Sequence, residues 1–227
     1  MKILGIDTST DVLGVAVTDD RALISEIRSN IKRAHAERLV PTIQNVLSNL
    51  GMRPNDLNGI AISIGPGSFT GLRIGLAAVK GIALATQTPV VSVVSLDVLA
   101  INARFWQQQI CPLIKAQMDE AYIAKYRFID NQLIKHGDYQ LMNLNELEQY
   151  IENQTLLINS GIKNFENYIP DHLKSQVMIA PPELSLTSGY ATALLGWEKL
   201  RQGEFEDIDQ LVPFYLKDFK AKKKVGL

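Results

Sequence analysis

The chain has 227 residues, of which 46% are hydrophobic and 21% charged, a composition typical of a globular protein with one large or two small domains. Lys and Arg total 23 against 24 Asp and Glu, so the net charge of −1 gives no overall basic field for nucleic acid. The single cysteine, Cys111, excludes an internal disulfide and a cysteine-based zinc site. The N-terminal apolar run ends at Asp7, and the most apolar stretch, residues 74–85, contains Lys80. Both are too short for a signal peptide or a membrane helix, so we expect a cytoplasmic protein without membrane contact.

The first half of the chain predicts a β-β-β-α-β-α-β unit. Its apolar, β-rich runs are separated by short polar turns, which favours antiparallel strands at the start. A first helix follows from apolar residues at helical spacing, which are Leu39, Ile43, Val46, Leu47 and Leu50. The expected elements are strands at 2–8, 12–18 and 22–28, a helix at about 35–50, a strand at 60–64, a helix from the turn at 65–71 to about 86, and a strand at 90–94.

The second half repeats that order with different residues. The expected elements are strands at 110–114, 121–128 and 136–142, a helix capped by Asn145 and carrying Leu147, Tyr150 and Ile151, a strand at 155–158, a short helix at 162–169, a strand at 177–180 and a final helix at 186–201. Two such lobes facing one another define the actin-like (ASKHA, ribonuclease H-like) α/β fold, which we predict. A doubly wound Rossmann sheet is the alternative, but it requires a helix after the first strand, where this chain has a hairpin.

These patterns predict an N-terminal lobe at 1–105 with the glycine-rich loop and the partner helices, a C-terminal lobe at 106–216 and a basic tail at 217–227. They leave open whether the final helix packs back on the first lobe. The tail holds five Lys and one Asp, a net charge of +4. Because it offers little apolar surface, we expect it to be mobile and dispensable for folding, with contact to RNA phosphates as the alternative.

The turn between the first two strands carries Asp7, Thr8, Ser9 and Thr10, at the place where an actin-like ATPase has its phosphate and metal loop. A carboxylate, hydroxyls and turn amides can hold a hydrated cation and phosphate oxygens. The alternative is a hairpin turn whose polar side chains bond their own backbone.

The glycine-rich string at residues 65–75 is the most distinctive motif. Pro66 fixes one φ angle, the glycines permit positive φ, and Ser68 is placed to cap the following helix, whose N-terminus suits an anion. The string lacks the lysine of a Walker loop and the spacing of a Rossmann loop, and a plain strand-to-helix turn is the alternative. The predicted vestigial nucleotide or anion site comprises Asp7, Thr8, Ser9, Gly65, Gly67 and Ser68.

The helix after this string is apolar nearly all round, with only Arg73 and Lys80 on a polar side. Such a helix is buried on more than one side, which favours one face on its own sheet and another against a partner. Its small residues would let a facing helix approach closely, and the same surface suits a homodimer. The alternative places both faces inside one lobe. The predicted partner interface comprises Gly71, Ile74, Gly75, Ala78, Ile82, His35 and Arg38.

The sequence predicts no metal site and no catalytic residue. His35, His136 and His172 are far apart in the chain, and His35 lacks the second histidine of a zincin motif. Ser68 is not in a G-x-S-x-G elbow.

Four strings together resemble the bacterial TsaB (YeaZ) family, in order and over the whole chain; they lie at 3–10, 35–41, 65–75 and 213–216. The resemblance implies an actin-like two-lobe protein acting in threonylcarbamoyladenosine formation on tRNA, beside the anticodon. It implies a non-catalytic subunit that pairs with the catalytic paralogue TsaD, with the ATPase TsaE docking on the pair and tRNA bound through the complex. The metal-binding His-x-x-x-His of that paralogue has no counterpart after Leu99.

The second lobe departs from the family pattern at two places. Lys115 stands where many members have an acid, although Glu120 is kept, and the adenosine-binding glycine pair is reduced to Gly161. Both differences favour a scaffold over autonomous ATP hydrolysis. They leave open whether ATP or ADP with Mg²⁺ binds at a subunit interface. The alternative function is an actin-like small-molecule kinase or ATPase that uses Asp7 and the glycine loop.

Overall fold

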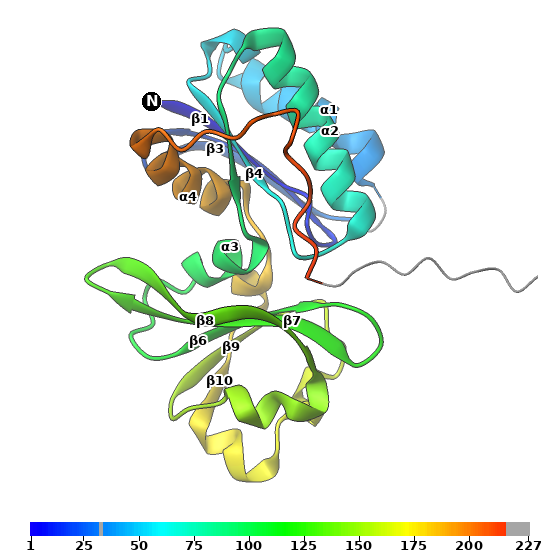
Figure 1. The fold of residues 1–227 in the computed structure, drawn as a ribbon, viewed down its shortest axis with the longest axis vertical. Helices are drawn as coiled ribbons and strands as arrows, with labels where there is room; N and C mark the ends of the chain where they lie inside the picture. Colours follow the sequence, from blue (N-terminus) through cyan, green and yellow to red (C-terminus); the bar gives the residue numbers. More distant parts are fainter. Residues whose placement is uncertain (32–33, 217–227) are drawn as a thin grey trace, which may run out of the picture.

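Two lobes, each built on one five-stranded sheet, form the computed structural model, which describes residues 1–31 and 34–216 (Figure 1). The predicted basic tail at 217–227 lies outside the described residues. The first lobe contains β1 (Lys2–Asp7), β2 (Val12–Asp19), β3 (Ala22–Asn30), α1 (His35–Asn49), η1 (Pro54–Asp56), β4 (Gly59–Ser63), α2 (Phe69–Thr86) and β5 (Val90–Val93). The second contains β6 (Ile110–Lys115), β7 (Glu120–Ile129), β8 (Gln132–Asn143), η2 (Leu144–Tyr150), β9 (Thr155–Ser160), η3 (Phe165–Tyr168), η4 (Asp171–Gln176) and β10 (Val177–Ile179). The remaining elements are α3 (Ser95–Ile101), η5 (Pro182–Ser185) and α4 (Gly189–Gln202).

The two sheets have the same topology. The first has the order β3-β2-β1-β4-β5 and the second, read in the same sense, β8-β7-β6-β9-β10. In each, the first three strands pair antiparallel and the last two add in parallel. This confirms the duplicated strand order predicted from the sequence, and the hairpin after β1 excludes the Rossmann alternative.

Both helices of the first half form where the sequence predicts them. The predicted stripe of α1 lies in the core of the first lobe, and Ser68 caps α2 by accepting a hydrogen bond from the Gly71 amide at 3.2 Å. Among the described residues, α2 alone has the length and apolar composition of a membrane span. In this fold it packs on the first sheet with Leu72, Leu76 and Val79 buried.

The second half differs from the prediction in its helices. The two helices expected at 145–151 and 162–169 are the 3₁₀ segments η2 and η3. Asn143, not Asn145, caps η2 by accepting from the Asn145 amide at 3.0 Å, and Asn164 has a positive φ of 49° that prevents a continuous helix at 162–169. The sequence also left α3 unassigned. It lies between the lobes and packs on the second sheet through Leu96 and Leu99 (Figure 1).

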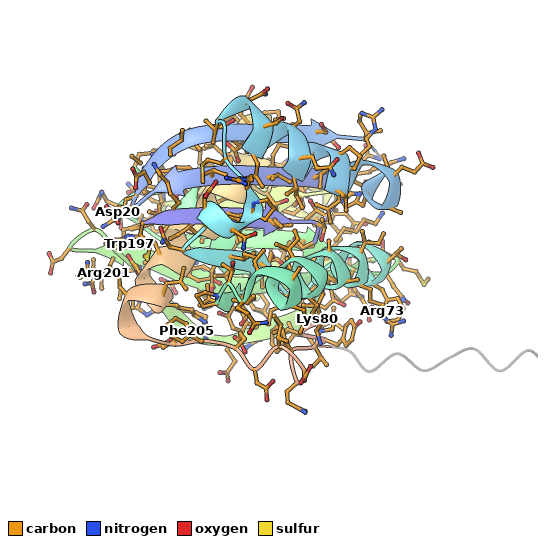
Figure 2. The ribbon with its side chains drawn as sticks, turned by 90° about the horizontal axis from the view of Figure 1, so that it is seen from above. Asp20, Arg73, Lys80, Trp197, Arg201 and Phe205 are labelled. Carbon is orange, nitrogen blue, oxygen red and sulfur yellow. The ribbon has the colours of Figure 1, made fainter. Side chains whose placement is uncertain are left out.

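The final helix α4 belongs to the first lobe in space. It crosses the face of the first sheet away from α1 and α2 (Figure 1), and its Ala193 and Leu200 are buried against Ile3 and Ala61. Close approach is possible because glycines face each other: a Cβ on Gly5 would lie less than 3.0 Å from α4 backbone atoms. Seen from above, Trp197 and Arg201 lie beside Asp20, and the Trp197 indole donates to Asp20 Oδ1 at 3.2 Å (Figure 2).

Residues 204–216 form a strap that returns along the first lobe. The Glu206 amide donates to the Val90 carbonyl and the Phe214 amide to the Ile64 carbonyl, both at 2.8 Å. The strap therefore covers the edge strand β5 and ends between the lobes, close to the N-terminus of α2 (Figure 1).

Candidate functional site

The start of the turn after β1, from Asp7 to Ser9, is buried. Asp7, Thr8 and Ser9 are each 0% exposed. Asp7 Oδ1 accepts hydrogen bonds from the Ser9 amide at 3.0 Å and the Ser9 hydroxyl at 2.9 Å, and the Thr8 hydroxyl donates to the Gly71 carbonyl at 2.8 Å. A Cβ on Gly67 would lie less than 3.0 Å from the Ser9 carbonyl oxygen. The turn and the glycine-rich loop are therefore in direct backbone contact, with no gap between them for a phosphate.

The residues at this turn do not fit the Mg²⁺ and nucleotide of an actin-like ATPase. Burial raises the pKa of the Asp7 carboxyl, and hydrogen bonds from Ser9 only partly oppose that rise. Asp7 Oδ2 is buried and has no hydrogen-bond partner among the described residues. A carboxyl that is sealed from solvent, and whose charged form burial disfavours, is a poor ligand for Mg²⁺, which keeps several waters. The described residues also contain no cluster of three His, Cys, Asp or Glu side chains.

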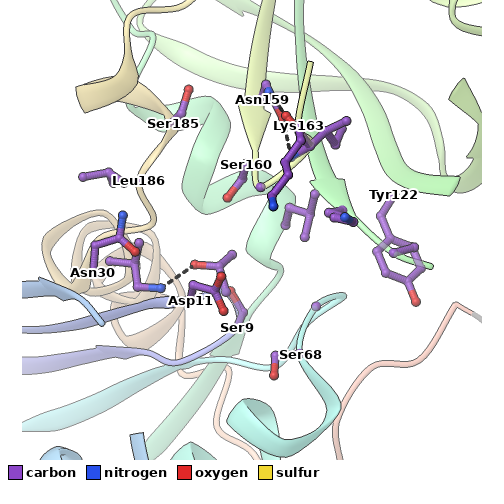
Figure 3. A pocket seen from close by; sticks show the side chains of 18 of the residues that line it. Ser9, Asp11, Asn30, Ser68, Tyr122, Asn159, Ser160, Lys163, Ser185 and Leu186 are labelled. Carbon is purple, nitrogen blue, oxygen red and sulfur yellow. Dashed lines mark hydrogen bonds between the residues drawn. The ribbon is translucent and has the colours of Figure 1, made fainter. Parts of the chain in front are cut away.

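A cleft of about 830 Å³ separates the sealed turn from the second lobe (Figure 3). Of the predicted anion-site residues, Ser9, Gly67 and Ser68 line the cleft, whereas Asp7, Thr8 and Gly65 do not. Gly65 instead contacts the strap, since a Cβ there would lie less than 3.0 Å from the Phe214 carbonyl oxygen. The structure therefore brings the six predicted residues together, but only three of them line the cleft.

The sequence reasoning missed three charged residues of the cleft. Asp11 lines it from the first lobe, and Lys163 and Glu166 line it from the second, as Lys115 does. Asp11 and Lys163 follow the carboxyl ends of central strands, β1 and β9, where open α/β sheets bind ligands. That placement is the signal that could have found them.

The predicted partner interface needs correction at three residues. A Cβ on Gly71 or Gly75 would lie less than 3.0 Å from Thr8, so both glycines face the interior of their own lobe. They are small because the β1–β2 turn packs against them, not to admit a partner helix. His35 is also buried, and its Nε2 has no hydrogen-bond partner among the described residues. Arg38 is exposed.

The outward face of α2 carries a different set of small and apolar residues. Ile74, Ala78 and Ile82 are half-buried against the first core. The exposed positions are Thr70, Arg73, Ala77, Gly81, Leu84 and Ala85. Leu84 is 58% exposed, and a Cβ on Gly81 would meet no atom within 4 Å. Arg73 projects outward at one end of this face (Figure 2). Val40, on the neighbouring helix α1, is 49% exposed.

A second buried carboxyl connects the lobes. Asp97 of α3 accepts hydrogen bonds from the Tyr126 hydroxyl at 2.6 Å and the Tyr139 hydroxyl at 3.0 Å, both from the second sheet. Burial raises the pKa of Asp97, and the two tyrosine hydroxyls act against that rise. The same burial raises the pKa of both tyrosine hydroxyls, that of Tyr126 more than that of Tyr139, so both stay protonated donors.

Comparisons with known proteins agree with this architecture. The family model described as "TsaD: tRNA N6-adenosine threonylcarbamoyltransferase" matches residues 22–225. The "tRNA threonylcarbamoyladenosine biosynthesis protein TsaB" of Bacillus subtilis is 30% identical over 99% of this chain and 97% of its own length. The solved structure of YeaZ from Pseudomonas aeruginosa is 26% identical and superposes with a TM-score of 0.81, over 95% of this chain and 99% of that one. The dehydratase component A of Acidaminococcus fermentans, 10% identical with a TM-score of 0.54 over 88% of this chain and 99% of that one, shares the fold alone. With its duplicated actin-like α/β fold and its full-length relatives, the chain belongs to the TsaB (YeaZ) family.

Proposed function

We propose that this protein is a non-catalytic scaffold and activating subunit in the formation of threonylcarbamoyladenosine on tRNA, at the adenosine beside the anticodon. The names of its full-length relatives support the pathway. The observation that carries the non-catalytic role is the sealed turn, where Gly67 contacts the Ser9 carbonyl and Asp7 is 0% exposed. In an actin-like ATPase this turn holds metal and phosphate, whereas in this chain it packs against the glycine-rich loop.

In this proposal the outward face of α2, with the adjoining surface of α1, binds a TsaD-like catalytic homologue. Ala77 and Gly81 would let a facing helix approach closely, and the exposed Leu84 and Val40 would supply apolar contact. A TsaE-like ATPase would dock on the pair, and tRNA would reach this subunit through the complex. Without the homologue, the same face would pair with a second copy of the chain.

Two measurements test the role. Depletion of the protein should lower threonylcarbamoyladenosine in total tRNA, measured by nucleoside mass spectrometry. Unchanged levels would contradict a role in this modification. The purified chain with Mg²⁺ and ATP should hydrolyse no ATP. Hydrolysis that is lost in Asp7→Ala would favour the kinase or ATPase alternative.

The interface is tested by adding bulk on the outward face. Gly81→Leu should weaken association with the TsaD-like homologue at least about tenfold, because it fills the space where helices meet. Its thermal midpoint should stay within about 2 °C of wild type, since a surface change rarely exceeds 0.5 kcal/mol. Gln202→Leu, at an exposed position of α4, is the control and should bind normally. Sedimentation of each variant with the homologue measures the association. Undiminished binding by Gly81→Leu would contradict the proposed interface.

A further inference from the structure

Two segments of the chain connect the lobes, residues 94–109 and residues 180–188. They are tied to each other, because the Asn102 side-chain amide donates to the carbonyls of Leu184 at 3.2 Å and Leu186 at 3.0 Å. The buried apolar cluster at this crossing is small and comprises Val93, Val98 and Ala191. Lobes move relative to one another unless a large apolar interface restrains them. The two connections by themselves therefore predict a hinged molecule.

The strap is fixed to the first lobe at several points. Leu211 is buried in the core of that lobe. The Ser92 hydroxyl donates to the Glu206 carboxylate, and the Phe214 amide donates to the Ile64 carbonyl at 2.8 Å. Because both the side chains and the backbone of the strap are held in this way, the strap must move together with the first lobe.

The end of the strap also contacts the second lobe. The Phe214 ring packs edge-on against the ring of Tyr139 on β8, with 5.7 Å between the centroids and 70° between the planes, an arrangement that aromatic pairs prefer. Tyr139 is itself held in place, since its hydroxyl lies 3.0 Å from each carboxylate oxygen of Asp97. The next strap residue, Tyr215, has its ring centroid 5.5 Å from that of Phe69 on α2. Aromatic side chains of the strap therefore bridge the two lobes.

We propose that the strap holds the two lobes at one fixed angle, through the contact of Phe214 with Tyr139. The backbone of Phe214 belongs to the first lobe and its ring packs on the second, so a change of the angle between the lobes would separate the two rings. The strap thus converts a hinged chain into one rigid body. Closure of the lobes around a ligand, as in hinged two-lobe proteins, is then suppressed. The inference rests on the contacts of the strap alone, so it can fail while the proposed role in tRNA modification holds.

Pulsed electron paramagnetic resonance tests the inference by measuring the distance between two nitroxide labels. Asp11→Cys and Lys163→Cys place the labels at exposed positions on opposite walls of the cleft. The native Cys111 does not compete for the label, because it is 0% exposed and burial raises its pKa to about 12. We expect one narrow distance distribution in the otherwise unchanged chain. Phe214→Ala should broaden that distribution, since the strap keeps its anchors on the first lobe but loses the ring that meets the second.

Three further variants identify the contact that matters. Phe205→Ala removes a ring of the same strap that is 58% exposed, and it should leave the distribution narrow. Tyr139→Leu removes the other ring of the contact and should broaden the distribution as Phe214→Ala does, which also keeps the test decisive where Phe214→Ala fails to fold. Tyr139→Phe keeps the ring, and Tyr126 still donates to Asp97, so its distribution should stay narrow. Circular dichroism establishes that each variant is folded.

Three results would overturn the proposal. The first is a broad distribution in the chain that carries only the labels, which would show that the lobes move despite the strap. The second is a narrow distribution in the folded Phe214→Ala and Tyr139→Leu variants. The third is broadening by Phe205→Ala or Tyr139→Phe as large as that caused by Phe214→Ala, because the contact between the two rings would then not be what fixes the angle.

Discussion

The two lobes have the same strand order but differ at the turn after the first strand. In the first lobe, the glycine-rich loop covers the start of the turn at Asp7 through contact of Gly67 with Ser9, and only the end of the turn, at Thr10 and Asp11, opens on the cleft. In the second lobe, the equivalent turn begins at Lys115 and opens on the cleft. Strand order persists because backbone pairing and the buried faces of the sheet fix it, whereas a turn contributes few core contacts and can change its side chains.

The lobes also differ in what covers their sheets. The first sheet has α1 and α2 on one face and α4 on the other, whereas the outer face of the second is covered by the 3₁₀ segments η2 to η4 (Figure 1). Long helices provide extended flat surfaces, and short turns do not. The first lobe therefore presents long helical faces to solvent, and both lobes contribute charged residues to the cleft, Asp11 from the first and Lys115, Lys163 and Glu166 from the second.

The largest expected effect comes from disrupting the contact between Gly67 and Ser9. Gly67→Ala should destabilise the protein by about 3 kcal/mol, because the new Cβ meets a backbone oxygen that cannot rotate away. Urea unfolding measures the change. Gly161→Ala is the matched change in the second lobe, where the added Cβ would have ordinary contact with Lys115 and only the positive φ is strained, at about 1 kcal/mol. An equal loss of unfolding free energy in the two variants would show that the two turns do not differ in how tightly they are packed.

A smaller effect concerns the contact between the lobes. Tyr126→Phe removes one of the two hydroxyls that Asp97 accepts from and should cost about 1 to 2 kcal/mol. The control is Tyr150→Phe, which loses a surface hydrogen bond to Gln140 and should change stability by less than about 0.5 kcal/mol. If both variants unfold at the same urea concentration, Asp97 does not hold the lobes together.

The smallest expected effect is a gain in stability rather than a loss. The folded-state pKa of Asp7 is raised, so the unfolded chain releases this proton at lower pH, and stability falls as pH rises from about 4 toward the raised value. Asp7→Asn has no proton to lose and should melt about 2 to 4 °C higher than wild type near neutral pH, as a change of about 1 kcal/mol would give. Melting curves between pH 5 and 8 should show this gain growing with pH. A wild type whose advantage over Asp7→Asn increases with pH would mean that Asp7 is ionised and paired.

The sequence by itself determined the elements whose signals are local. The polar turns around Asp7 and the apolar stripe from Leu39 to Leu47 predict the hairpin and α1, and Ser68 predicts the start of α2, because hydrogen bonding and side-chain spacing act within a few residues. It failed where local signals are weak. The short apolar runs after Asn143 and Asn164 do not distinguish an α-helix from a 3₁₀ turn.

Only the tertiary structure shows which segment packs against each glycine. Gly75 has the same helical neighbours whether it meets a partner or its own lobe, and only the position of Thr8 shows that it is buried. Gly5 is likewise small because Gly189, far away in the chain, crosses it. The cleft follows the same rule, since Lys115 and Gly161 become neighbours only through the pairing of β6 with β9. Contacts of this kind depend on which segments the fold brings together, and spacing along the chain carries no record of that.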